Sequence, residues 1–153
     1  APGREVEVWP ELKELMGSKL SSIPAAELEE AFVHAFRGVV PNDKRFLGGE
    51  TIGELFDRVL PALDRLLADP AWDTVLLVLH GAVNRAILSY ALTGQRMFLG
   101  HLEQAAGCVN VLDVGDEELV LRRFGGNARR RRFPGARADR VRAQGRQEVQ
   151  ARP

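Results

Sequence analysis

His80 is the residue in this sequence best placed to do chemistry. It ends the apolar run 75–79 and is followed at once by Gly81, in the stretch VLLVLHGAVNRAIL. An imidazole can donate a hydrogen bond to a phosphoryl oxygen or act as a nucleophile. Gly81 lets a ligand approach the backbone, and the helix expected from Ala82 favours an anion at its N-terminus. The alternative is a histidine that only caps this helix or bonds a neighbouring carbonyl.

The elements around His80 predict an α/β architecture. The run 74–79 is short, apolar and bounded by turn signals, which is typical of a strand buried on both faces. The preceding helix opens with a capping box, Thr51 with Glu54, and the following helix stops at Gly94. This order indicates a mostly parallel sheet, in which ligands collect at the carboxyl ends of the strands. His80 lies at such an end.

Further sequence patterns predict the buried face of the capped helix, an earlier helix and a hairpin. One face of the capped helix is apolar: Ile52, Leu55, Val59, Leu63 and Leu66. Pro61 within that helix is expected to kink it or to remove one backbone hydrogen bond. An earlier helix is predicted between Ser22 and Gly38, and the segments on either side of Gly115 predict a hairpin.

The charges divide the chain into two parts. With 153 residues, 45% of them hydrophobic, the chain has the size of one ordinary domain. Residues 1–121 carry 10 Lys and Arg against 19 Asp and Glu, whereas residues 122–153 carry 11 Arg against 2 acidic residues. Because apolar periodicity ends after Phe124, we predict a domain over residues 1–124 and a basic, disordered tail over residues 125–153.

Composition argues against several partners and sites. The tail has enough arginine to contact nucleic acid or acidic lipid, but it matches no nucleic-acid module, and the acidic domain is a ready internal partner. No apolar run is long enough for a membrane span. The single Cys108 and the lack of a signal-like start favour a reducing cytoplasm. Asp57, Asp64 and Asp73 have no His or Cys cluster beside them, so we expect neither a metal nor another cofactor.

Two motifs follow one another at a specific spacing. The turn 48–51, Gly-Gly-Glu-Thr, opens a helix that bears Arg58, and an apolar run then ends in His80 and Gly81. This arrangement, from about Val6 to Phe124, resembles the phosphoglycerate mutase-like branch of the histidine phosphatase superfamily. The resemblance implies a three-layer α/β sandwich with a mostly parallel sheet.

The resemblance also implies a function and roles for individual residues. Members hydrolyse phosphomonoesters through a phosphohistidine, so the expected partner is a phosphorylated small molecule. His80 matches the second histidine, which holds phosphoryl oxygens, and Gly81 and the N–H of Ala82 would bind the phosphate. Glu14, in the segment PELKEL, resembles the acid that protonates the leaving group.

The departures from the family pattern limit this expectation. The nucleophile motif Arg-His-Gly is absent, since His34 lies in FVHAF and His101 in GHLEQ. We therefore predict an N-terminally incomplete domain with impaired hydrolysis, or alternatively an inactive module that binds phosphate or a phosphorylated ligand. Loss of the first strand would leave its neighbours without a partner, which predicts poor stability as a monomer unless the chain has remodelled or forms a homo-oligomer.

Overall fold

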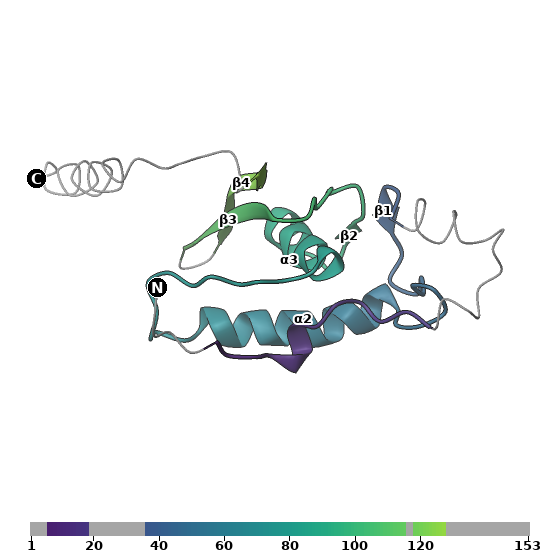
Figure 1. Cartoon of the computed structure of the whole chain (residues 1–153), viewed down its shortest axis with the longest axis horizontal. Helices are drawn as coiled ribbons and strands as arrows, with labels where there is room; N and C mark the ends of the chain where they lie inside the picture. Colours follow the sequence, from purple (N-terminus) through teal and green to yellow (C-terminus); the bar gives the residue numbers. More distant parts are fainter. Residues whose placement is uncertain (1–5, 19–35, 116–117, 128–153) are drawn as a thin grey trace, which may run out of the picture.

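The computed structural model describes residues 6–18, 36–115 and 118–127, in which two helices pack with two small antiparallel sheets (Figure 1). The elements in chain order are η1 (Pro10–Leu12), β1 (Val39–Val40), α2 (Ile52–Leu67), α3 (Gly81–Thr93), β2 (Phe98–Leu99), β3 (Cys108–Val114) and β4 (Leu119–Asn127). The class is therefore mixed α/β. In the described residues neither helix is long and apolar enough to cross a membrane.

Helix α2 begins at the predicted capping box. The hydroxyl of Thr51 accepts a hydrogen bond from the N–H of Glu54 at 3.1 Å, and the N–H of Thr51 donates to the Glu54 carboxylate at 2.7 Å. All five residues of the predicted apolar face are buried: Ile52, Leu55, Val59, Leu63 and Leu66. The helix continues through Pro61, so the proline lacks a backbone donor there without ending the helix.

Helix α3 packs against α2 and completes the core. It ends, as predicted, at Gly94, whose φ of 65° is the left-handed conformation that favours glycine at a helix C-terminus. Phe56 of α2, Val83 of α3 and Phe98 of β2 are fully buried between the elements. The rings of Phe56 and Phe98 meet edge to face, with centroids 6.2 Å apart.

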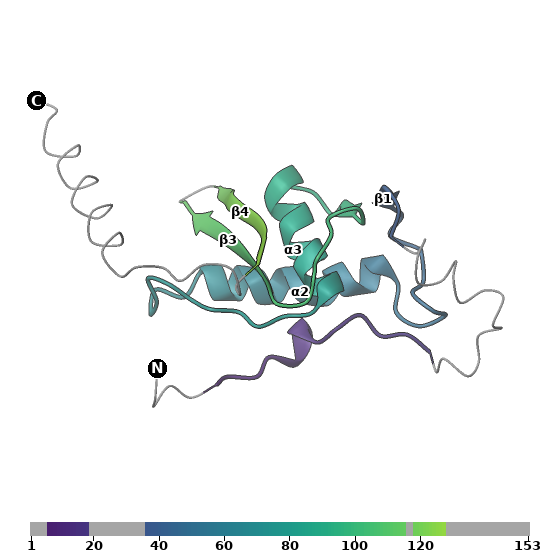
Figure 2. The ribbon, with the colours of Figure 1, turned by 45° about the horizontal axis from the view of Figure 1, so that its top comes forward.

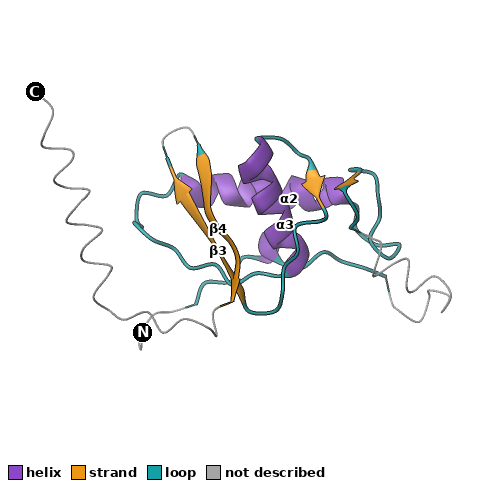
Figure 3. Cartoon of the chain, turned by 90° about the horizontal axis from the view of Figure 1, so that it is seen from above, coloured by secondary structure: helices purple, strands orange, loops and turns teal. Residues whose placement is uncertain are grey.

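The two sheets are both antiparallel pairs. β1 pairs with β2, and β3 pairs with β4 as the predicted hairpin, whose second strand continues to Asn127 (Figure 3). The expected mostly parallel sheet is not formed among the described residues. The predicted helix between Ser22 and Gly38 falls mostly on residues 19–35, and the basic tail mostly on residues 128–153, which lie outside the described residues.

The prediction of a buried strand at 74–79 is wrong for the described structure. Residues 75–79, called the unpaired segment below, run back along α2 to α3 without forming a strand (Figures 1 and 2). Leu76 and Val78 are 85% and 89% exposed. No backbone hydrogen bond joins the segment to another described residue. Because a strand needs a neighbour for its N–H and C=O groups, apolar composition alone does not bury this one.

Candidate functional site at the N-terminus of α3

His80 stands immediately before α3. Its backbone is extended, with φ −100° and ψ 170°, and its carbonyl accepts the N–H of Asn84 at 3.0 Å. The imidazole is exposed, and it does not cap the helix. Within the described residues the ring makes no hydrogen bond, so the interpretation of His80 as a helix cap is not supported there.

The carboxylate of Glu14 lies at the same end of the helix. Its Oε1 accepts hydrogen bonds from the N–H of Leu15 at 2.9 Å and of Ala82 at 3.2 Å. Its Oε2 is 3.9 Å from the point where a side chain on Gly81 would begin. The N–H of Ala82 belongs to the first turn, whose donors have no partner inside the helix. The structure thus gathers Glu14, Gly81 and Ala82 beside His80, although Glu14 is 68 residues from Ala82.

Arg85 is a site residue that the sequence analysis missed. Its Nη1 lies 3.3 Å from where a Gly81 side chain would begin, and its buried Nε has no hydrogen-bond partner among the described residues. The guanidinium also stands over the ring of Phe36, 5.3 Å from the centroid. A useful signal was available, because an arginine four residues after Gly81 extends back toward the helix N-terminus.

The electrostatics of this site combine a partly buried cation with nearby carboxylates. Burial lowers the pKa of Arg85, and the charges of Glu14 and Glu103 act against that shift. Arginine stays protonated even so. A cation is therefore placed at the positive end of the α3 dipole, where it would be unfavourable without negative charge nearby. Glu14 supplies one such charge and Glu103 supplies another.

The segment that carries Glu14 is held by the turn 48–51. Gly48 has a φ of 69°, and any side chain on Gly49 would collide with the carbonyl of Met16 and with Gly17. These two glycines therefore let the turn pack closely on the N-terminal segment. The Nε of Arg58 donates to the carboxylate of Glu50 at 2.6 Å, so this arginine forms a structural ion pair with the turn.

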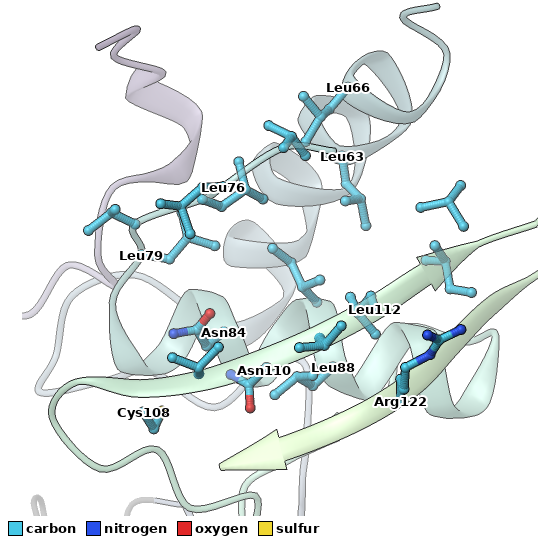
Figure 4. Close-up of a pocket in the computed structure, with 18 of the residues that line it drawn as sticks. Leu63, Leu66, Leu76, Leu79, Asn84, Leu88, Cys108, Asn110, Leu112 and Arg122 are labelled. Carbon is cyan, nitrogen blue, oxygen red and sulfur yellow. The ribbon is translucent and has the colours of Figure 1, made fainter. Parts of the chain in front are cut away.

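A separate cavity lies between α2, α3 and the β3–β4 hairpin. Its volume is about 1310 Å³, and it separates the unpaired segment from the β3–β4 hairpin (Figure 4). Leucines of α2, α3 and the hairpin line it, with polar groups from Asn84, Asn110 and Arg122. It reaches Gly81 but neither His80 nor Glu14. The cavity is therefore the space beside the unpaired segment and is distinct from the site around Glu14 and Arg85.

Other predicted residues are not part of the site, or fall outside what the structure describes. His34 lies outside the described residues, and His101 is exposed in the turn after β2. Asp57 pairs with Arg96 at 2.6 Å. The described residues include no group of three His, Cys, Asp or Glu side chains that could hold a metal ion.

Comparison with known proteins identifies the family. The family model of the histidine phosphatase superfamily, branch 1, matches residues 1–127. No curated protein and no solved structure matches the chain. Since the family model covers most of the chain, including α2, His80, Gly81 and the hairpin, the protein belongs to branch 1 of the histidine phosphatase superfamily.

Proposed function

We propose that the N-terminus of α3 is a phosphate site and that this chain carries part of a phosphomonoesterase of the histidine phosphatase type. One observation carries the proposal. Glu14, Ala82 and Arg85 lie close together at the N-terminus of α3, directly after His80. Family membership supports the same chemistry. The substrate is a phosphorylated small molecule, and the complete domain is a three-layer sandwich with a mostly parallel sheet.

Each residue has a physical role in this proposal. Phosphoryl transfer depends mainly on positioning and on stabilising charge at the phosphoryl oxygens. Arg85, the His80 imidazole and the backbone around Gly81 and Ala82 hold those oxygens. Glu14 is the proton donor to the leaving group. Because Glu14 already accepts the Ala82 N–H, an incoming phosphate must share or take over that donor.

Hydrolysis by these 153 residues alone is impaired in this proposal. The nucleophile motif Arg-His-Gly does not occur among them, so no residue matches the histidine that the phosphoryl group would modify. This absence favours a second candidate function, a module that binds phosphate or a phosphorylated ligand without turnover. Both functions use the same site, and they differ only in whether phosphate is released.

The test is hydrolysis of para-nitrophenyl phosphate together with thermal unfolding in inorganic phosphate. The variants are His80→Ala and, as a matched control on an exposed histidine, His101→Ala. The phosphatase predicts slow hydrolysis that His80→Ala removes and His101→Ala retains. The binding module predicts a rise in Tm with phosphate that depends on His80, and no hydrolysis. If neither hydrolysis nor phosphate-dependent stabilisation is seen, both functions are wrong.

A further inference from the structure

Arg58 makes far more contacts than one ion pair needs. Its Nε and Nη2 donate to the two oxygens of Glu50, at 2.6 Å and 2.9 Å. Its Nη1 donates to the carbonyls of Glu11 at 2.6 Å and Lys13 at 2.8 Å, and its Nη2 donates to the carbonyl of Glu14 at 3.2 Å. These contacts match the five donors of a guanidinium. Arg58 therefore binds the backbone of the segment that carries Glu14.

Glu50 completes the attachment on the other side of Glu14. Its Oε2 accepts the N–H of Met16 at 3.1 Å, and its own N–H donates to the carbonyl of Met16 at 2.7 Å. The pair is well buried, with 5% of the Glu50 side chain and 16% of the Arg58 side chain exposed. Residues 11–16, called the anchored segment below, are thus fixed both before and after Glu14.

The anchored segment has little regular structure of its own. Only the single turn η1 overlaps it, and no strand includes it. The position of the Glu14 backbone consequently depends on the Arg58–Glu50 pair together with the buried side chain of Leu15. The carboxylate then reaches Leu15 and Ala82 through a short side chain. A shift of this backbone by about one ångström is enough to spoil a hydrogen bond of 3.2 Å or the geometry of a proton donor.

We propose that Arg58 and Glu50 are positioning residues, which hold the Glu14 carboxylate on the N-terminus of α3. The consequence for catalysis rests on the function proposed above, because it requires Glu14 to serve as the proton donor. The geometry requires arginine in particular. A lysine would keep the charge but would lose the planar fork that binds Glu50 and three carbonyls together.

The test is amide hydrogen exchange at Ala82 in Arg58→Lys, measured by NMR. We expect exchange about tenfold faster than in the wild-type chain, the size that loss of one hydrogen bond allows. Arg65→Lys is the matched control, since Arg65 lies on the same helix and binds the Glu11 side chain at 3.2 Å but is largely exposed. Its Ala82 exchange should stay within about twofold of the wild-type rate, since exposed ion pairs contribute little.

The possible results distinguish a positioning role of Arg58 from a general loss of stability, and they test this role independently of the proposed phosphatase activity. Unchanged Ala82 exchange in Arg58→Lys overturns the proposal, and so does a rise matched by the buried amide of Leu63 in α2, which would report loosening of the whole domain. If Arg58→Lys does not fold, Ala82 exchange is measured in Glu50→Gln instead. The glutamine amide keeps a hydrogen-bond acceptor for Arg58 but loses the charge. If the wild-type chain hydrolyses no phosphate ester, the proposed hydrolysis fails while the exchange result still decides the positioning role.

Discussion

The anchored segment and the unpaired segment are two stretches without α-helix or strand that lie beside α2, and they differ in whether their backbone N–H and C=O groups have hydrogen-bond partners. The anchored segment is half polar, and Arg58 and Glu50 bind its backbone carbonyls and one of its amides. The unpaired segment is entirely apolar, yet none of its backbone groups bonds another described residue, and Leu76 is exposed. Hydrogen-bond partners for the backbone, and not apolar composition, therefore decide which of the two segments is fixed.

Removing the charge that fixes the anchored segment should have a large effect on stability. Glu50→Ala leaves the Arg58 guanidinium partly buried without its carboxylate, and we expect a loss of about 3 kcal/mol in the free energy of unfolding. The three carbonyls that Arg58 still binds keep the loss near the lower end of the usual range. Urea unfolding measures the change. A loss well below 1 kcal/mol would mean that the pair does not anchor the segment.

Truncating one leucine in the core and one in the unpaired segment tests whether the unpaired segment contributes to stability. Leu55→Ala, in the core, should lower the free energy of unfolding by about 2–5 kcal/mol, whereas Leu76→Ala should change it by less than about 0.5 kcal/mol. Both are measured by urea unfolding at two protein concentrations. A large, concentration-dependent loss in Leu76→Ala would show that a second copy covers the segment, and the contrast would then fail.

Acid should loosen the anchored segment selectively. Burial raises the pKa of Glu50, but hydrogen bonds from Arg58 and Met16 outweigh it and hold the pKa below its ordinary value of 4.5. A depressed carboxyl pKa contributes stability that is fully present above the unfolded value and is lost as pH falls through the folded value. We therefore expect wild-type stability to fall below about pH 4.5 more steeply than that of Glu50→Gln. Equal slopes in urea unfolding would contradict this.

Local signals in the sequence predicted part of this structure. Thr51 with Glu54, the stop at Gly94 and the hairpin around Gly115 depend on residues close in sequence, and each forms as predicted. The apolar run at 75–79 was misleading because burial of a strand requires a neighbouring strand, which a local pattern cannot supply.

The site residues also divide into those that a local motif predicts and those that depend on contacts distant in sequence. The apolar run ending in His-Gly predicted His80 and Gly81, which are adjacent in sequence. The contact between Glu14 and Ala82 crosses 68 residues, so periodicity could not have found it, and only the family resemblance suggested Glu14. Helical spacing places Arg85 on α3, but it does not by itself distinguish a solvated arginine from one directed at the helix N-terminus.

The most direct test of the central claim is an NMR titration of the chain with inorganic phosphate. A phosphate site there should give saturable shifts of the amides of Gly81 and Ala82 and of the His80 ring, and Arg85→Met should abolish those shifts. Shifts confined to the arginine-rich residues 128–153, or no saturable shift at α3, would contradict a phosphate site at the N-terminus of α3.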